Sequence, residues 1–266
     1  MSNLEHESGL KSDRPSLIFQ RLGRVGYQRS YELQQRYVTT VQGWREHATT
    51  ESTGPVAPAG IVLLLEHDPV VTISNRPSAQ GNLLASTVQL ASAGVEVAMT
   101  DRGGDITYHG PGQLVAYPIV DLNRLHLRLH EYMRCLERAV IRVCNHFGVA
   151  AAADPEATGV WVGLPHENAT KVDGAPARKI CAMGIRVRQW VSLHGLALNV
   201  STNLSHFGLI VPCGLVGRPV TSLRAELGDA ACPTMEQVMD KLTIELADAL
   251  RCTSEPMSKS REAHHQ

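Results

Sequence analysis

The class of fold is decided by the stretch Ile61-Val62-Leu63-Leu64-Leu65-Glu66-His67, which is followed by Asp68-Pro69 and Val70-Val71-Thr72-Ile73-Ser74. Both apolar runs are short and rich in branched side chains, so each predicts a buried strand. The proline between them interrupts the ladder, because it has no backbone N–H to donate. Strands that follow one another without a helix between them favour an α+β fold over a doubly wound parallel sheet.

Apolar patterns on either side extend this prediction. Helical spacing of apolar residues predicts helices over residues 27–44 and 129–147. A last helix is expected to begin after Thr234, with Gln237 at the capping-box position. Further strands are expected at residues 94–99, 114–120, 160–162, 179–187 and 190–200. The expected architecture is one domain in which a mixed or antiparallel sheet is flanked by helices.

The ends of the chain differ in composition from its middle. Residues 1–16 and 253–266 are polar and poor in apolar side chains, so both are predicted to be disordered tails around a single domain at 17–252. No apolar run approaches the length of a signal sequence or a membrane span, and a cytoplasmic location is therefore expected.

The charge balance and the cysteines exclude several classes of function. The chain has 25 basic and 26 acidic residues, without the basic excess on which general nucleic-acid binders depend. Its six cysteines form no CxxC pair, so neither a disulfide framework nor a zinc site is indicated, and no metal is expected.

The densest chemical motif is the run Arg102-Gly103-Gly104-Asp105-Ile106-Thr107-Tyr108-His109-Gly110-Pro111-Gly112-Gln113. Glycine pairs permit a close approach of ligand to backbone, and Gly110-Pro111-Gly112 predicts a tight turn after a short extended segment. A plain hairpin with glycine-rich ends is the simpler interpretation. The presence of an arginine, a tyrosine and a histidine at one turn favours a binding site instead.

Two later segments are predicted strands that carry polar residues. The first, Arg178–Val187, brings Lys179, Cys181 and Met183 to one face. A lysine at the start of such a strand is usually a solvated end. The second segment, Ser192–Val200, contains His194, which is more often a structural histidine than a catalyst, and Gly195, beside which a ligand has room to pass.

A cysteine stands between proline and glycine in Pro212-Cys213-Gly214. The sulfur of Cys213 is predicted to be accessible because it belongs to a turn, although a small buried residue filling a corner is an equally good interpretation of this motif alone. Cys181 competes for the role of nucleophile because it shares a strand face with Lys179, but sulfur inside a strand is usually packed and inert.

Together these four segments resemble the lipoyl(octanoyl) transferase family in motif, order and spacing, over roughly residues 20–250. The resemblance implies the fold of lipoate-protein ligase and of the biotin protein ligase catalytic domain. It also implies an acyltransferase that moves octanoyl from acyl carrier protein to a lysine of lipoyl domains, in 2-oxoacid dehydrogenase E2 subunits and the glycine cleavage H protein.

Matched position by position, the resemblance assigns Cys213 as the residue that accepts the acyl group and Lys179 as the lysine that activates it. The segments implied to line the acyl pocket are Arg102, Gly103, Gly104, Asp105, Ile106, Thr107, Tyr108 and His109, then Ala182, Met183 and Gly184, then Gly195, Leu196 and Ala197. No cofactor is implied, since the acyl group arrives on phosphopantetheine. A monomer is expected, with no nucleic-acid or membrane partner. The 47–60 and 164–177 stretches depart from the family pattern.

The chemistry of these residues agrees with that assignment. A free thiol has a pKa of about 8.5, so a neighbouring ammonium is needed to favour the thiolate at neutral pH. Lys179 supplies one if the fold brings it to Cys213, and in its neutral form it accepts a proton from the attacking amine. Arg102, Arg186, Arg188, Arg218 and Arg224 are available to meet an acidic carrier protein.

Three rival functions remain open from sequence. An ATP-dependent lipoate or biotin ligase has the same fold, but the Pro-Cys-Gly turn has no purpose there. A cysteine thioester hydrolase would use His109 or His194 as its base. A binding module for acyl carrier protein would form no covalent intermediate.

Overall fold

The computed structural model describes residues 14–48, 57–164, 176–212 and 217–256. In this part of the chain the main sheet has eight strands in the order β11-β1-β2-β6-β10-β9-β8-β7. A smaller sheet has the order β4-β3-β5. The main-sheet strands are β1 (Ser16–Val25), β2 (Gly60–His67), β6 (Gln113–Val120), β7 (Ala151–Ala153), β8 (Val160–Val162), β9 (Arg178–Arg188), β10 (Val191–Asn199) and β11 (Thr253–Pro256). The small sheet contains β3 (Val70–Ser74), β4 (Glu96–Thr100) and β5 (Ile106–His109).

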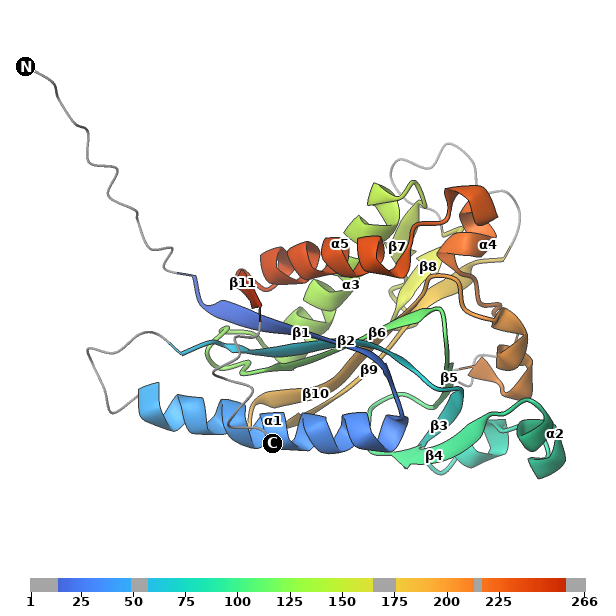
Figure 1. The fold of residues 1–266 in the computed structure, drawn as a ribbon, viewed down its shortest axis with the longest axis horizontal. Coiled ribbons are helices and arrows are strands. Elements are labelled where there is room, and N and C mark those ends of the chain that lie inside the picture. Colours follow the sequence, from blue (N-terminus) through green and yellow to red (C-terminus); the bar gives the residue numbers. More distant parts are fainter. Residues whose placement is uncertain (1–13, 49–56, 165–175, 213–216, 257–266) are drawn as a thin grey trace, which may run out of the picture.

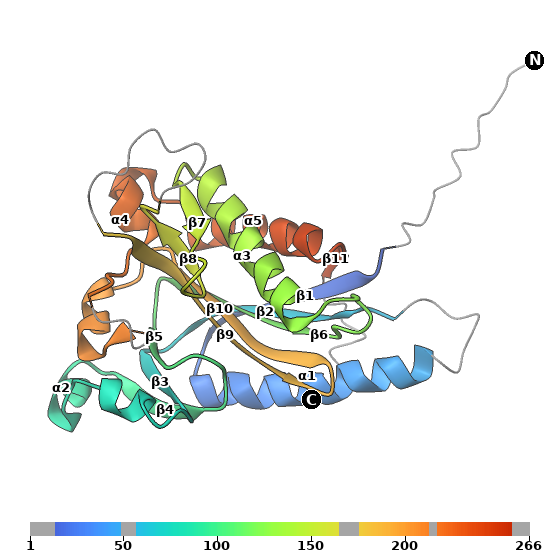
Figure 2. The same cartoon turned by 180° about the vertical axis from the view of Figure 1, so that it is seen from behind.

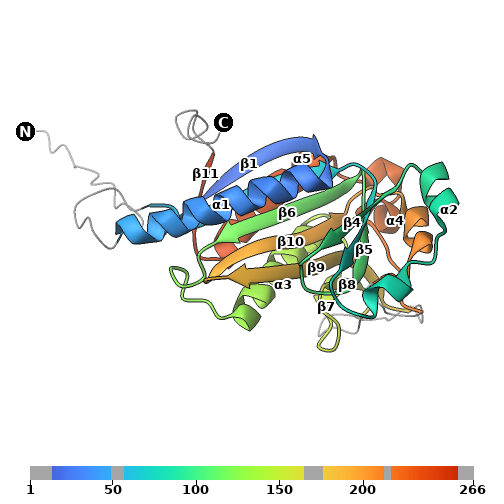
Figure 3. The ribbon, with the colours of Figure 1, turned by 90° about the horizontal axis from the view of Figure 1, so that it is seen from below.

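Helices cover both faces of the main sheet. Helix α1 (Tyr27–Ala48) lies on one face, whereas α3 (Leu129–His146) and α5 (Met235–Ala249) lie on the other (Figures 1 and 2). The small sheet and the short helices α2 (Thr87–Ser92) and α4 (Leu223–Leu227) gather at one end of the main sheet (Figure 3). That end contains the pocket described below.

The alternation of side chains along β2 explains the two-sided packing. Ile61, Leu63 and Leu65 belong to the core beneath α1, and Val62 and Leu64 to the core beneath α3 and α5. All five are fully buried, as expected for a central strand covered on both faces. The apolar run of β2 therefore supplies two cores at once.

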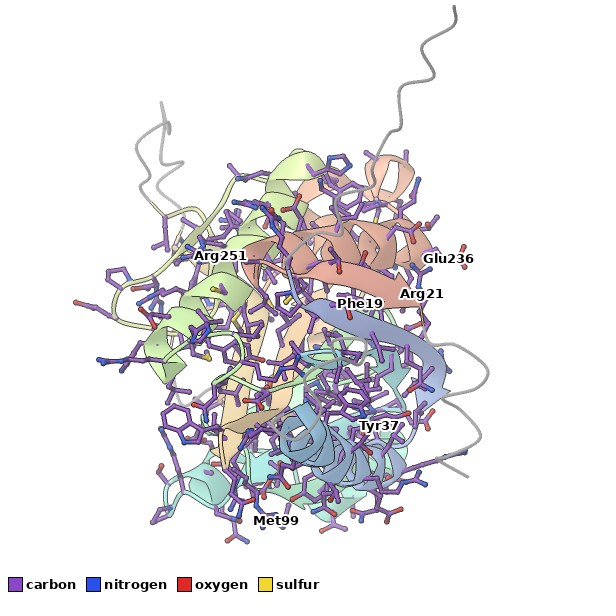
Figure 4. The ribbon with its side chains drawn as sticks, turned by 90° about the vertical axis from the view of Figure 1, so that its left-hand side faces the viewer. Phe19, Arg21, Tyr37, Met99, Glu236 and Arg251 are labelled. Atoms are coloured by element: carbon purple, nitrogen blue, oxygen red, sulfur yellow. The ribbon has the colours of Figure 1, made fainter. Side chains whose placement is uncertain are left out.

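Helix α1 is attached to the sheet by a polar contact as well as by apolar packing. Tyr37 points from α1 into the molecule (Figure 4), and its hydroxyl donates to Oε1 of Gln20 on β1 at 2.8 Å. The helix connects the parallel strands β1 and β2. The other neighbouring pairs from β2 to β7 are antiparallel, so the sheet is mixed.

The structure confirms the predicted α+β class and the mixed sheet flanked by helices. It also confirms the capping box of α5, in which Thr234 and Gln237 satisfy each other's backbone N–H groups. Strand β1 was not predicted from sequence, because Gln20, Arg21 and Arg24 hide its apolar start. Helix α2 was missed because it spans less than two turns.

The predicted tails are wrong at their inner ends. Residues 253–256, expected within a disordered tail, form β11, which pairs in parallel with residues 16–19 at the start of β1. Ser16, the last residue of the other predicted tail, accordingly belongs to a strand. A short polar strand at a sheet edge gives no sequence signal of its own, since backbone pairing and not side-chain burial holds it. Residues 1–13 and 257–266 lie outside the described residues.

Within the described part of the chain, each helix is too short or too polar to cross a lipid bilayer.

Candidate active site

A pocket lies on the α1 side of the main sheet, where strands β9 and β10 meet the small sheet and the first turn of α1. Strands β9 and β10 pair so that Ala182 faces Ala197 and Gly184 faces Gly195. The lining residues are Tyr27, Arg102, Gly104, Asp105, Thr107, His109, Tyr117, Ala182, Met183, Gly184, His194, Gly195, Leu196 and Ala197. Small side chains on two neighbouring strands thus leave space above the sheet, and the loop at 102–105 covers it.

One backbone contact holds the covering loop against β9. The N–H of Gly103 donates to the carbonyl of Ile185 at 3.0 Å. A Cβ atom on Gly184 would lie 2.5 Å from the carbonyl oxygen of Gly103, closer than real Cβ atoms approach. The loop and the strand can touch only because residue 184 is glycine.

Arg102 fastens the same loop to the small sheet. Its guanidinium donates to the carbonyl and hydroxyl oxygens of Thr72 on β3, at 2.9 and 3.0 Å, and to the carbonyl of Gly103 at 3.0 Å. Arg102, one of the five arginines considered for meeting a carrier protein, therefore holds the loop in place.

Asp105 closes the other side of the loop. Its carboxylate accepts from Nδ2 of Asn82 and from the backbone N–H of Ile106, both at 2.8 Å, and from the hydroxyl of Ser78 at 3.2 Å. A buried carboxylate that accepts three hydrogen bonds holds its donors firmly in place. It ties the segment around Asn82 to the pocket wall.

A chain of hydrogen bonds runs from the pocket to the backbone of Lys179. Gln113 donates from Nε2 to the side chain of Asn199 at 2.9 Å, so its oxygen must accept from Nδ1 of His109 at 2.7 Å. Asn199 donates to the carbonyl of Thr221 at 2.9 Å, and the N–H of Thr221 donates to the carbonyl of Lys179 at 2.9 Å. These hydrogen bonds fix the relative positions of five residues that come from four parts of the sequence.

Beneath His109 lies a second buried histidine, His67. Its Nδ1 must donate to the carbonyl of Val25 at 2.7 Å, so its Nε2 accepts from the hydroxyl of Tyr117 at 2.8 Å. Burial lowers the pKa of His67 to about 4. Burial, with a contribution from His67, also lowers the pKa of His109 well below its ordinary value. Both imidazoles are neutral at physiological pH.

His194 lies at the end of the pocket and is bound to an acid. Its Nε2 lies 2.7 Å from Oδ1 of Asp101, whose other oxygen accepts from the hydroxyl of Tyr31 at 2.8 Å. Arg186 also pairs with Asp101. Burial opposes ionisation of Asp101, but the hydrogen bonds from His194 and Tyr31 prevail and lower its pKa. Burial lowers the pKa of His194, which is therefore a neutral donor to the carboxylate.

Lys179 lies in a buried position beside an aromatic ring. Its Nζ is 4.7 Å from the centre of the Trp161 ring, and the guanidinium of Arg218 lies 3.8 Å from the same centre. Arg218 also forms an ion pair with Asp154 at 2.5 Å. Two cations at one ring create a local environment that favours an anion such as a thiolate.

The described cysteines are poorly suited to act as nucleophiles. Cys181 is fully buried, and burial raises the pKa of its thiol well above the ordinary value. Burial also raises the pKa of Cys135, and it raises those of Cys144 and Cys252 to about 12. The sulfur of Cys232 is directed to the carbonyls of Val200 and Pro233, outside the pocket. Cys213 lies outside the described residues.

The two flanks of the Cys213 segment are described, and both are anchored at the site. On one side, the N–H of Val211 donates to the carbonyl of Asn82 at 2.8 Å, beside Asp105. On the other side, the carbonyl of Pro219 accepts from the N–H of Lys179 at 2.9 Å. The described flanks thus lie beside Asp105 of the pocket wall and at the strand that carries Lys179.

Most of the residues predicted to form the pocket are in its lining. Those brought together are Arg102, Gly104, Asp105, Thr107, His109, Ala182, Met183, Gly184, Gly195, Leu196 and Ala197. Gly103 contributes its backbone contact to Ile185 instead. Ile106 and Tyr108 were placed wrongly, because side chains alternate along β5 and these two pack into the small-sheet core. The Tyr108 hydroxyl lies 2.7 Å from Nδ1 of His206, away from the pocket.

Sequence reasoning missed three pocket residues: Tyr27, Tyr117 and His194. Tyr27 was assigned only to a helix face and Tyr117 only to an apolar strand. His194 was interpreted as structural, although its position next to Gly195 was a usable signal. The stretch at 164–177, which departs from the family pattern, lies almost wholly outside the described residues.

Comparison with known proteins assigns the chain to a family. The model of the lipoyl protein ligase A/B catalytic domain matches residues 29–247. The chain belongs to this family. The match includes the loop at 102–105, strands β9 and β10, and the segment that contains Cys213.

Curated relatives carry the name octanoyltransferase. The chain is similar to one from Myxococcus xanthus (44% identity over 79% of this chain and 53% of the relative) and to one from Bacteroides fragilis (46% identity, 71% and 80%). One from Acidobacterium capsulatum is 43% identical over 82% of this chain and 83% of its own. The alignment thus spans about half the length of the Myxococcus relative and most of the other two.

Solved structures show the same fold at low identity. A bipartite lipoate protein ligase from Thermoplasma acidophilum has a TM-score of 0.61 at 17% identity, covering 94% of this chain and 89% of its own. Lipoate-protein ligase A bound with ATP has a TM-score of 0.59 at 15% identity, covering 94% and 92%. The expected lipoate-ligase fold is confirmed.

The contact between Gly103 and β9 predicts the effect of a single added methyl group. Gly184→Ala should lower the free energy of unfolding by about 1–3 kcal/mol, because the loop has to move away from the strand. Chemical denaturation measures this. Gly81→Ala is the matched control, since its Cβ would have nothing within 4 Å. Equal stability of the two variants would contradict the tight contact.

The buried His67 predicts a loss of stability in acid. Unfolded histidine takes up a proton below a pKa of about 6.5, whereas folded His67 does so only near 4. Its contribution is therefore present above pH 6.5 and lost as pH falls toward 4, by up to about 3 kcal/mol. His67→Gln should show a smaller fall in unfolding free energy between pH 7.5 and 5 than the parent. His126→Gln, at an exposed histidine, should keep the parent's slope, and an unchanged slope in His67→Gln would refute the assignment.

Proposed function

We propose that this chain transfers an octanoyl group from an acyl carrier protein to a lysine of a lipoyl domain, with Cys213 as the acyl acceptor and Lys179 as its partner. Membership in the family and the name of the curated relatives support octanoyl transfer in protein lipoylation. The observation that carries the residue assignment is the anchoring of both flanks of the Cys213 segment, one beside Asp105 and one at Lys179.

In the first step the Cys213 thiolate attacks the thioester carbonyl of the carrier-bound acyl group. The new carbon–sulfur bond forms as the bond to the phosphopantetheine sulfur breaks, and the Lys179 ammonium gives its proton to the departing thiolate. The exchange of one thioester for another changes little in bond energy, so positioning and thiolate formation dominate the barrier. No ATP is needed, since the acyl group arrives activated.

In the second step the amine of the lipoyl-domain lysine attacks the acyl-enzyme. An amide bond forms, the Cys213 thiolate leaves, and neutral Lys179 accepts the proton that the amine loses. The Trp161 ring and the burial of Lys179 restrict water around its Nζ.

The acyl chain fits the pocket between β9 and β10. The lining at Ala182, Gly184, Gly195 and Ala197 offers little side-chain bulk, and Met183 and Leu196 add apolar surface. The neutral state of His109 keeps charge out of the space that an alkyl chain would occupy. An aliphatic acyl group is the ligand that this lining favours.

The partners follow from the same proposal. The donor is octanoyl-acyl carrier protein, and the acceptors are lipoyl domains of 2-oxoacid dehydrogenase E2 subunits and the glycine cleavage H protein. Of the arginines considered for the carrier, Arg186 pairs with Asp101, Arg218 with Asp154, and Arg224 with Asp229 at 3.4 Å. The absence of a cofactor or metal, the monomeric state and the cytoplasmic location stay predictions.

The rival functions are separated by the fate of the acyl group. A ligase of this fold requires ATP and free acid, a hydrolase passes the acyl group to water, and a binding module forms no bond. Transfer from octanoyl-carrier protein to a lipoyl-domain lysine without ATP excludes all three in one assay.

Replacing the sulfur of Cys213 tests the covalent route. Cys213→Ser should reduce transfer by at least about a thousandfold, because a hydroxyl is a far weaker nucleophile than a thiolate at neutral pH. Its melting temperature should equal that of the parent, since the change is nearly isosteric. Transfer at the parental rate would show that the acyl group reaches the lipoyl domain by another path.

Replacing Lys179 tests which cysteine it serves. Lys179→Met keeps an unbranched buried side chain without the ammonium, and it should raise the pKa of Cys213, measured as alkylation rate against pH. Acylation should slow by about a hundredfold. Cys181→Ala is the control and should leave both quantities unchanged. A shift in Cys181→Ala, with none in Lys179→Met, would reassign the nucleophile.

A further inference from the structure

The end of the pocket far from Lys179 is formed by His194. Along β9 and β10 the paired positions run from Ala182 and Ala197, through Gly184 and Gly195, to Ile185 and His194. Lys179 lies three residues before Ala182, so His194 is at the opposite end. At about 3.3 Å per residue, Ala182 and Ile185 are roughly 10 Å apart, which is comparable to an extended octanoyl chain.

The backbone of β10 turns abnormally at this histidine. His194 has a φ of 57°, in the left-handed region that residues with a side chain rarely adopt. Pro118 on β6 has no N–H, and the pairing of β10 with β6 is interrupted between Leu196 and Val191. The N–H of His194 instead donates to Oε1 of Gln34 on α1 at 2.8 Å. Such a conformation persists where surrounding contacts enforce it, commonly at binding sites.

The side chain of His194 is fixed as firmly as its backbone. Asp101 holds its Nε2 at 2.7 Å, and the ring of Tyr31 stacks on the imidazole with centroids 5.5 Å apart. Tyr117 meets it edge-on at 6.4 Å. The residue is 1% exposed and still lines the pocket. These contacts restrain a residue that is remote from Lys179, which points to a role in shape.

We propose that His194, positioned by Asp101, is the end wall that limits the length of the acyl chain. The inference rests on the proposed function, and Asp101 acts only through the imidazole. With Nε2 donating to the carboxylate, Nδ1 carries a lone pair, for which the described residues provide no hydrogen-bond partner. A longer chain would meet the ring and also cover this polar nitrogen with hydrocarbon, which is unfavourable.

The test is the chain-length profile of His194→Gly. Glycine adopts the left-handed backbone freely, so this substitution removes the wall without adding strain. Rates of transfer are measured with hexanoyl-, octanoyl-, decanoyl- and dodecanoyl-carrier protein. The ratio of kcat/KM for dodecanoyl to octanoyl should rise by at least roughly tenfold over the parent. His126→Gly is the matched control, an exposed histidine with a φ of 52°, and should keep the parental ratio.

Further variants and a second readout keep the outcomes distinct. Asp101→Asn should shift the ratio in the same direction by less, because the ring loses its anchor but remains. If His194→Gly does not fold, His194→Asn decides, since asparagine tolerates this backbone and is shorter. Calorimetric binding of free octanoate and dodecanoate tests the wall without catalysis. An unchanged profile in a folded variant overturns the proposal. A parent that binds these acids but transfers none refutes the proposed function instead.

Discussion

The hydrogen bond from the Gly103 N–H to the Ile185 carbonyl is the contact on which the rest of the site depends. It joins the small sheet to the main sheet at one point, and Gly184 permits it by having no side chain. Arg102 and Asp105 then fix the loop on either side, to Thr72 and to Asn82. Without this contact the loop at 102–105 would lose its backbone hydrogen bond to β9, and with it the position that covers the pocket.

The polar groups around the pocket are arranged so that the histidines carry no charge. His67 and His109 are buried and neutral, and each donates from Nδ1 to an oxygen. The negative charge of Asp101 is satisfied by His194, Tyr31 and Arg186 outside the space that the chain would occupy. An apolar ligand therefore enters a cavity in which His109 and Asp101 are already engaged in hydrogen bonds. Two further basic side chains, Lys179 and Arg218, lie beside Trp161.

Local sequence signals predicted the regular elements well, and the reasons are physical. The proline at 69 and the branched residues on either side specify β2 and β3, and Thr234 with Gln237 specifies the start of α5. The burial expected of Cys181 is confirmed, because its strand has neighbours on both sides and its side chain packs into the core. Strand β11 was beyond such reasoning, since its pairing with β1 joins residues over 200 positions apart.

The site residues could be predicted where clusters of glycines or charged residues mark them in the sequence. They could not be predicted where only tertiary packing brings a residue to the pocket. Gly184 and Gly195 are informative because a glycine within a strand indicates that another segment of the chain packs closely against it. A Cβ atom on Gly184 would meet Gly103, and one on Gly195 would meet Ala116. Tyr27 and Tyr117 carry ordinary apolar patterns and reach the pocket only through the packing of α1 on the sheet. His194 was interpreted as a structural histidine, yet its bond to Asp101 and its left-handed backbone place it at the pocket end.

The most direct test of the account is a search for the acyl-enzyme by mass spectrometry. The protein is mixed with octanoyl-carrier protein, and a portion is digested to locate the octanoyl group before apo lipoyl domain is added to the remainder. We expect the adduct on the peptide that contains Cys213, followed by its loss as an octanoyl-lysine appears on the lipoyl domain. Octanoyl-lysine formed without any adduct on the enzyme, or an adduct on Cys181, would contradict it.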